Sequence, residues 1–241
     1  MALIVQKYGG SSLCNADKIK EVAEHIIATM GKGAQPVVVV SAMQHETDKL
    51  LNFAEEASGS FNGRELAKLL STGEVVSSAL LAGTLQSLGY AAISLTGAEA
   101  GIRTDANYTR ARILKVDPKR VIKEIEKGRI VIVAGFQGIT DEMDITTLGR
   151  GGTDITAVVL AAALGVKCVI YHEHAGVYTA DPRLVPEAQQ LSEISYEELL
   201  ELAGSGSKVL QPRAVELGWV NKVPILITNI SNGQNGTLVH A

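Results

Sequence analysis

The first group of residues that could do chemistry lies at positions 7–12, where the sequence reads KYGGSS directly after an apolar run at residues 2–5. Glycines such as Gly9 and Gly10 let the main chain approach an anion closely, and consecutive amides form a concave set of donors. Lys7 adds a positive charge, and serines 11 and 12 add hydroxyl groups. This combination suits a polyphosphate, although a tight strand-to-helix turn with a surface lysine explains it equally well. The spacing is neither that of a Walker A loop nor G-x-G-x-x-G.

A second glycine-rich group reads GRGGTD at residues 149–154 and precedes the apolar helical run ITAVVLAAALG. Gly151 and Gly152 therefore sit at the expected N-terminus of a buried helix, where free amides and the helix dipole favour an anion. Arg150 could form a bidentate pair with a carboxylate. Asp154 needs a metal or a lysine between itself and any phosphate; otherwise it is an ordinary acidic residue in a first helical turn. Two such loops in one chain favour a functional interpretation.

These groups must be positioned by strands and helices, and the pattern of apolar residues predicts an α/β sheet. Four short runs are almost purely apolar without alternation, which is typical of parallel strands buried on both faces: 36–42, 129–136, 167–172 and 223–228. Helical patterns lie between them. Asn15 can cap a helix with an apolar stripe, Ser195 and Glu198 have the spacing of a capping box, and residues 116–128 start with Asp-Pro and end with Gly. This alternation predicts a mostly parallel sheet covered on both faces, with ligands beyond the carboxyl ends of its strands.

Composition restricts the class of protein. The 241 residues, 46% of them hydrophobic, suffice for one large core, and neither an internal repeat nor a linker divides them. Residues 59–63 and 139–149 are interpreted as surface excursions, so we expect one domain over 1–241. The formal charge of −4 argues against a nucleic-acid partner. Two cysteines without a secretory signal indicate the cytoplasm rather than a disulfide framework, and no apolar stretch approaches the ~20 residues needed to span a membrane.

Several long strings together resemble the aspartate kinases of the amino acid kinase family, in order and over essentially the whole chain. The strings include KYGGSSL (7–13), LLSTGE (69–74), TTLGRGGTD (146–154), GVYTADPR (176–183) and NGTLV (235–239). The resemblance implies a three-layer αβα sandwich around a central, mainly parallel eight-stranded sheet, the carbamate kinase-like fold. It implies ATP- and Mg²⁺-dependent phosphorylation of the β-carboxylate of L-aspartate to 4-phospho-L-aspartate, the first step toward lysine, threonine and methionine. It also implies a homodimer.

The resemblance assigns roles to individual residues. Lys7 and Asp154 would be catalytic, with Lys7 bridging the phosphates. The residues implied to contact the phosphates and the rest of the nucleotide are Gly9, Gly10, Ser11, Ser12, His172, Glu173, Tyr178, Asp181, Arg183 and Lys208. Those implied to bind aspartate are Thr47, Glu74, Arg150, Gly151, Gly152 and Thr153. Glu74 lies in an apolar helical run, where an unpaired carboxylate is costly, so a bound ammonium would complement it unless it simply faces solvent. Magnesium would be carried by the nucleotide, without a direct protein ligand.

The sequence departs from the family pattern at residues 172–175, which read HEHA where relatives usually carry Thr-Asp-Val-Asp. This change bears on nucleotide affinity and on the preference for adenine. His172 and His174 alternate onto one face and could imitate a metal pair, but magnesium prefers oxygen ligands. The chain also ends at residue 241, where relatives continue into paired ACT regulatory domains, so it is either truncated or a stand-alone form.

Three functions remain open from the sequence. The first is an aspartate kinase, and the order of LLSTGE and TTLGRGGTD favours it over glutamate 5-kinase, acetylglutamate kinase and UMP kinase, which share the fold. The second is an acyl-phosphate kinase of specialised metabolism that acts on another acidic amino acid. The third is a non-catalytic nucleotide-binding homologue, suggested by HEHA but opposed by the presence of Lys7 and Asp154.

Overall fold

A central eight-stranded sheet organises the protein. The computed structural model describes residues 2–182, 184–205, 209–231 and 235–241. The strand order is β10-β12-β11-β9-β1-β2-β6-β3, and every neighbouring pair is parallel except β11 and β12. The strands are β1 (Ala2–Tyr8), β2 (Ala34–Val40), β3 (Ala92–Leu95), β6 (Ile130–Ala134), β9 (Cys168–Tyr171), β10 (Glu193–Ser195), β11 (Ile225–Thr228) and β12 (Thr237–His240). The predicted mainly parallel sheet is confirmed, and the four apolar runs correspond to β2, β6, β9 and β11.

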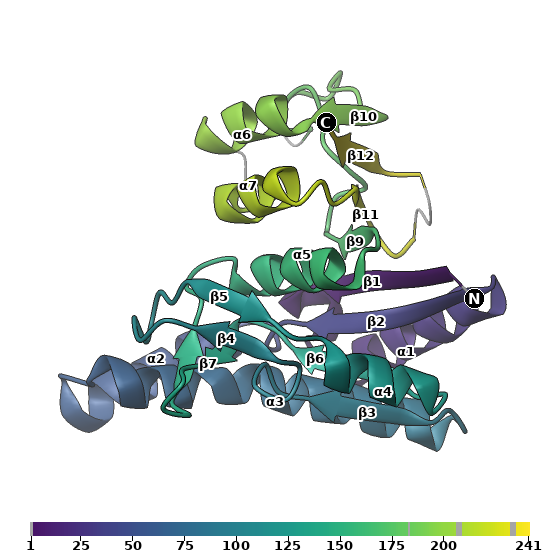
Figure 1. Cartoon of the computed structure of the whole chain (residues 1–241). Coiled ribbons are helices and arrows are strands. Elements are labelled where there is room, and N and C mark those ends of the chain that lie inside the picture. The colour runs from purple at the N-terminus through teal and green to yellow at the C-terminus, as the bar shows by residue number, and fades with distance from the viewer. Residues whose placement is uncertain (1, 183, 206–208, 232–234) are drawn as a thin grey trace.

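Helices cover both faces of this sheet, as Figure 1 shows. One face packs against α1 (Ala16–Gly31) and α3 (Gly63–Ser87), through a core that includes Val22 and Leu85. The opposite face packs against α4 (Lys119–Glu126), α5 (Gly152–Leu164), α6 (Tyr196–Gly204) and α7 (Pro212–Val220). A 3-10 turn, η1 (Gly10–Leu13), follows β1, and α2 (Glu46–Ser58) follows β2. The three-layer αβα architecture is therefore confirmed.

The predicted helix starts are also confirmed. The Asn15 side chain accepts a hydrogen bond of 2.9 Å from the amide of Lys18 at the start of α1. Ser195 and Glu198 form the expected capping box at the start of α6, each side chain reaching the main chain of the other. Such caps satisfy amides that the first turn of a helix leaves without partners.

Strand β1 is longer than the apolar run at residues 2–5 suggests. It continues to Tyr8, and Lys7 pairs with Val39 of β2 and Ile170 of β9. Because side chains alternate along a strand, Lys7 faces α5, whereas Gln6 and Tyr8 face α1. Lys7 therefore belongs to an ordered central strand and not to the loop after it.

A second, four-stranded sheet lies beside the first, in the order β5-β4-β7-β8. Its strands are β4 (Ile102–Thr104), β5 (Ile113–Val116), β7 (Gln137–Ile139) and β8 (Ile145–Thr147). The prediction that residues 139–149 are a surface excursion holds only for the exposed turn at 141–143; β7 and β8 form a hairpin around it, and Thr146, Thr147 and the following Leu148 are buried. Residues 59–63 do form an exposed connection, between α2 and α3. No helix among the described residues has the length and apolar character to cross a membrane.

Candidate active site

A cavity of about 850 Å³ lies beyond the carboxyl ends of β1 and β9. It brings together eight of the residues predicted to contact a phosphate or nucleotide: Lys7, Gly9, Gly10, Ser11, His172, Glu173, Tyr178 and Asp181. Ser12 lies next to these residues in the turn η1, where its amide donates to the carbonyl of Gly9 at 3.1 Å. Arg183 and Lys208 lie outside the described residues. The cavity occupies the strand-end position that parallel α/β sheets use for ligands.

Lys7, which lines the cavity, forms an ion pair of 2.8 Å with Asp154, which lies behind it and does not line the cavity. Their side chains are only 10% and 14% exposed, so each charge is largely removed from water and needs the other. Lys7 comes from β1 and Asp154 from the first turn of α5. The ammonium also lies beside the main chain of Gly9, since a Cβ built there would be 3.6 Å from Nζ. Strand β1 and helix α5 thus hold the Lys7 ammonium next to the main chain at the start of η1.

The loop after β1 packs tightly against the loop after β2. A Cβ at Gly10 would lie 2.7 Å from the carbonyl oxygen of Ala42 and 3.3 Å from the amide of Gln44, so only glycine fits without a shift. The amide of Ala42 in turn donates a hydrogen bond of 3.0 Å to Glu74 Oε1. The nucleotide-side loop is therefore connected through one short segment to the predicted aspartate-binding carboxylate.

Glu74 is buried in α3, with a side chain that is 3% exposed, so the solvent-facing interpretation is wrong. Its Oε1 accepts the hydrogen bond from Ala42, whereas its Oε2 has no hydrogen-bond partner among the described residues. Burial raises the pKa of this carboxyl to about 7, against the opposing effect of the Ala42 amide. A buried carboxylate oxygen without a partner is unfavourable by itself and suits a cationic ligand.

The other predicted aspartate-binding residues lie at helix starts outside the cavity lining. Gly151 is the N-cap of α5 with a φ of +72°, and a Cβ there would overlap the Gln211 side chain at 1.8 Å from its Cγ. Gly152 and Thr153 are buried in the first turn of α5, and the exposed Arg150 precedes them. Thr47 is half-buried in the first turn of α2. The structure thus places this set on α2, α3 and α5 and does not gather it into the cavity.

The unusual segment HEHA contributes three residues to the cavity wall. His172 continues β9, and the rings of His172 and His174 lie 6.0 Å apart with a tilt of 32°. The amide of His174 donates to His172 Nδ1 at 3.4 Å. Burial, and then the neighbouring Lys7, lower the pKa of His172. Among the described residues, no group of three or more His, Cys, Asp or Glu side chains is placed to hold a metal ion.

Sequence reasoning missed several residues that line the cavity, including Tyr171, Gln44, Leu202 and Val209. Tyr171 stacks on Tyr8 with ring centroids 4.7 Å apart, and its hydroxyl accepts a hydrogen bond of 2.9 Å from Gln6. The apolar run around Tyr171 marked a strand but gave no sign that its last residue borders a cavity.

The fold and the site together define the class of protein: the chain belongs to the amino acid kinase family, whose sequence pattern matches residues 2–229. Within that family it is 50% identical over 240 residues to an aspartokinase of Geobacillus stearothermophilus, covering 99% of this chain and 59% of the relative. A crystal structure of aspartate kinase from Synechocystis superposes with a TM-score of 0.87 at 47% identity, covering 100% of this chain and 40% of that one. A structure of E. coli aspartokinase III in complex with lysine and aspartate has a TM-score of 0.82 at 25% identity, covering 99% and 64%. The chain therefore spans only part of the length of these relatives.

Proposed function

We propose that the protein transfers the γ-phosphoryl group of ATP to the β-carboxylate of L-aspartate, giving 4-phospho-L-aspartate and ADP. The observation that carries this proposal is the Lys7–Asp154 pair, 2.8 Å apart, whose lysine lines a cavity large enough for a nucleotide. The similarity to aspartokinases over 99% of the chain supports aspartate as the acceptor.

The proposed chemistry requires alignment and neutralisation of charge. A carboxylate, whose ordinary pKa is about 4, is already an anionic nucleophile at pH 7 and needs no general base. The obstacle is repulsion between this anion and the nucleotide phosphates, which a fixed cation can offset. Lys7 supplies that cation, and Asp154 holds it in place. The amides of Gly9 and Gly10 and the hydroxyl of Ser11 supply further donors to the phosphates.

Aspartate would be bound by its three charged groups. The free Oε2 of Glu74 accepts from the α-ammonium, Arg150 pairs with a carboxylate, and Thr47 and Thr153 add hydrogen bonds. The buried position of Glu74 supports this assignment, because an ammonium would provide a partner for Oε2, which has none within the described part of the chain. The amides at the start of α5, including those of Gly151 and Gly152, would favour the negative charge of the substrate.

The nucleotide would occupy the cavity, with Tyr178, Asp181 and the HEHA segment on its wall. Magnesium suits phosphate oxygens and water better than an all-protein cage, so we propose that it arrives on the nucleotide, where it offsets phosphate charge.

Residues 1–241 would form one catalytic domain. We also propose a homodimer, for which the exposed Val76 and Leu80 of α3 offer an apolar surface; light scattering would test it.

A trapping assay tests the proposed reaction. The protein is incubated with MgATP, L-aspartate and hydroxylamine, which displaces phosphate from an acyl phosphate to give a hydroxamate; this is detected as its coloured ferric complex, and ADP is measured in parallel. We expect equal amounts of hydroxamate and ADP, both dependent on aspartate. Product with another acidic amino acid only would favour a different acyl-phosphate kinase. MgATP binding by calorimetry without any product would favour a non-catalytic homologue and contradict the proposal.

A further inference from the structure

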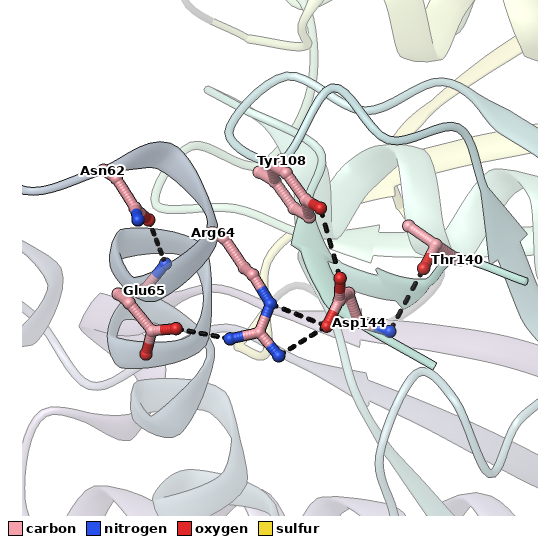
Figure 2. Close-up of polar contacts among 6 residues, drawn as sticks. All are labelled: Asn62, Arg64, Glu65, Tyr108, Thr140 and Asp144. Atoms are coloured by element: carbon pink, nitrogen blue, oxygen red, sulfur yellow. Dashed lines mark hydrogen bonds and ion pairs between the residues drawn. The ribbon is translucent and has the colours of Figure 1, made fainter. Parts of the chain in front are cut away.

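Asp144, at the turn of the β7–β8 hairpin, has both carboxylate oxygens engaged by side chains from distant segments (Figure 2). Nε and Nη2 of Arg64 lie 2.7 and 2.6 Å from Oδ1, and the hydroxyl of Tyr108 donates to Oδ2 at 3.1 Å. The main-chain amide of Asp144 donates to Thr140 Oγ1 at 3.1 Å, which closes the turn. Arg64 is paired with Glu65 as well.

This network connects three parts of the chain that are far apart in sequence. Arg64 belongs to the first turn of α3, Tyr108 to the loop between β4 and β5, and Asp144 to the hairpin. Tyr108 holds the hairpin at a second point, because its carbonyl accepts a hydrogen bond of 2.6 Å from the amide of Thr147 in β8. Tyr108 therefore contacts both ends of β8, and the start of α3 is fixed through Asp144 to the first of these ends.

A second tie joins the hairpin to α3 close to Glu74. The buried side-chain amide of Gln137, in β7, donates a hydrogen bond of 2.9 Å to the carbonyl of Ser71. Ser71 precedes Glu74 by one helical turn. Since an α-helix rises about 1.5 Å per residue, Arg64 and Glu74 are about 15 Å apart along the axis, and the two ties hold the helix at both positions.

The same hairpin leads directly to Arg150. Strand β8 ends at Thr147, and Leu148 is fixed by a hydrogen bond of 2.8 Å from its amide to the carbonyl of Phe136. The amide of Ala111 donates to the carbonyl of Thr147 at 2.9 Å, so the chain is held on its other side as well. Two residues after Leu148 comes Arg150. One hairpin therefore contacts the helix that carries Glu74 and supplies the segment that carries Arg150.

We propose that Asp144, held by Arg64 and Tyr108, is a positioning residue that fixes the separation between Glu74 and Arg150 and thereby selects the length of the amino-acid substrate. This inference rests on the proposed function, in which Glu74 and Arg150 bind the charged groups of aspartate. Glutamate carries the same groups with one more methylene, so a fixed separation discriminates between the two acids and a loosened one does so less well.

A purely structural role for Asp144 would have a different signature. The side chain of Arg64 is 45% exposed and that of Asp144 is 14% exposed, and an ion pair with one partner in contact with water contributes less to stability than a pair buried on both sides. Errors in the placement of substrate-binding groups, in contrast, have large kinetic effects. The kinetic consequence of removing Asp144 should therefore exceed its effect on unfolding, and it should fall on the amino acid and not on the nucleotide.

The experiment measures steady-state kinetics of the full chain with Asp144→Ala and Asp144→Asn. We expect Asp144→Ala to raise the KM for aspartate about tenfold, with an unchanged KM for ATP, and to lower the preference for aspartate over glutamate. Asp144→Asn keeps the size and a hydrogen-bonding oxygen, so it should be intermediate. If Asp144→Ala does not fold, Tyr108→Phe removes only one hydrogen bond and should shift the same two quantities by less. Glu21→Gln, which breaks the exposed Lys18–Glu21 pair on α1, is the matched control.

The outcomes separate this inference from the proposed function. A parent protein without aspartate-dependent turnover overturns both. An active parent with variants that lose thermal stability but keep the KM for aspartate and the aspartate preference overturns the inference alone. Equal increases in the KM values for aspartate and ATP also overturn it, because they would indicate general loosening of the fold.

Discussion

The two halves of the proposed active site, a nucleotide half and an aspartate half, are built in different ways. In the nucleotide half, residues from the ends of β1 and β9 and the segment after β9 converge on one cavity of about 850 Å³. In the aspartate half, Glu74 and Arg150 come from different elements, and neither lines that cavity. Glu74 is held by the amide of Ala42, and the connection to the Arg150 segment runs through the β7–β8 hairpin. The nucleotide half depends on the sheet itself, and the aspartate half depends on hydrogen bonds and an ion pair between separate elements.

The two halves should therefore respond differently to substitutions. A change at the end of a central strand alters a group proposed to touch the nucleotide but leaves the sheet intact. A change that removes a hydrogen bond or ion pair between elements leaves the proposed substrate-binding side chains unchanged but alters their positions. The following variants test whether the two halves act separately.

The largest effect is expected at the meeting point of the two halves. Lys7→Met removes the cation that we place between the nucleotide phosphates and the aspartate carboxylate, and it keeps most of the side-chain volume. We expect kcat to fall about 10²–10³-fold, the range seen when one preorganised charge-stabilising group is removed. Turnover at saturating aspartate and ATP measures it, with the exposed Lys18→Met of α1 as the control. Equal kcat values for Lys7→Met and the parent would exclude Lys7 from the transfer step.

The next effect concerns stability and follows from the raised pKa of Glu74. A carboxyl whose pKa is about 7 in the folded protein stabilises the fold when protonated, below about pH 4.5, and loses that contribution as pH rises through 7. At pH 8 the ionised, buried Glu74 should therefore cost about 3 kcal/mol, which Glu74→Gln avoids. Urea unfolding should show the variant more stable than the parent at pH 8 and equal to it near pH 4.5. A variant less stable than the parent at pH 8 would mean that the carboxylate already has a cationic partner.

A smaller effect is expected from Arg150→Lys, which keeps the charge but loses the planar fork of the guanidinium. We expect the KM for aspartate to rise about tenfold, corresponding to part of one charge-assisted pair, and the KM for ATP to stay the same. Initial rates with each substrate varied in turn give both constants. An increase in the KM for ATP alone would indicate that Arg150 binds the nucleotide and not aspartate.

The smallest effect is expected from Asn15→Ala, which removes the cap of α1 far from both halves of the site. Loss of such a cap costs about 1 kcal/mol of stability. The midpoint of urea unfolding should fall, and both KM values should remain those of the parent. A kinetic effect here would show that the site responds to any loss of stability, and the comparison between the two halves would lose its basis.

The sequence predicts the nucleotide half better because most of its residues fall into two short segments of the chain, 7–11 and 171–182. The apolar runs identified β2, β6, β9 and β11, and the glycines after β1 indicated the phosphate-side loop. The extent of β1 was missed because Gln6 and Lys7 interrupt its apolar pattern, although the strand tolerates the charge of Lys7 through its pair with Asp154. Tyr171 was missed because nothing in an apolar run shows which residue borders a cavity.

The aspartate half was predicted only as separate residues. The 139–149 segment looked like a surface loop because it is rich in Thr, Asp and Glu, yet Thr146 is buried with its hydroxyl 2.6 Å from that of Thr104. Arg64 and Asp144 are 80 residues apart, and nothing local to either one indicates the other. Contacts of this kind depend on the assembled fold, so periodicity and motif spacing do not reveal them.

The most direct test of the two-half account is calorimetric titration of the parent, Glu74→Gln and Lys7→Met with MgADP and, separately, with L-aspartate. We expect Glu74→Gln to abolish detectable aspartate binding with the MgADP affinity unchanged, and Lys7→Met to weaken MgADP binding but not aspartate binding. If Glu74→Gln weakened MgADP binding as strongly as aspartate binding, the nucleotide and aspartate halves would not be separate.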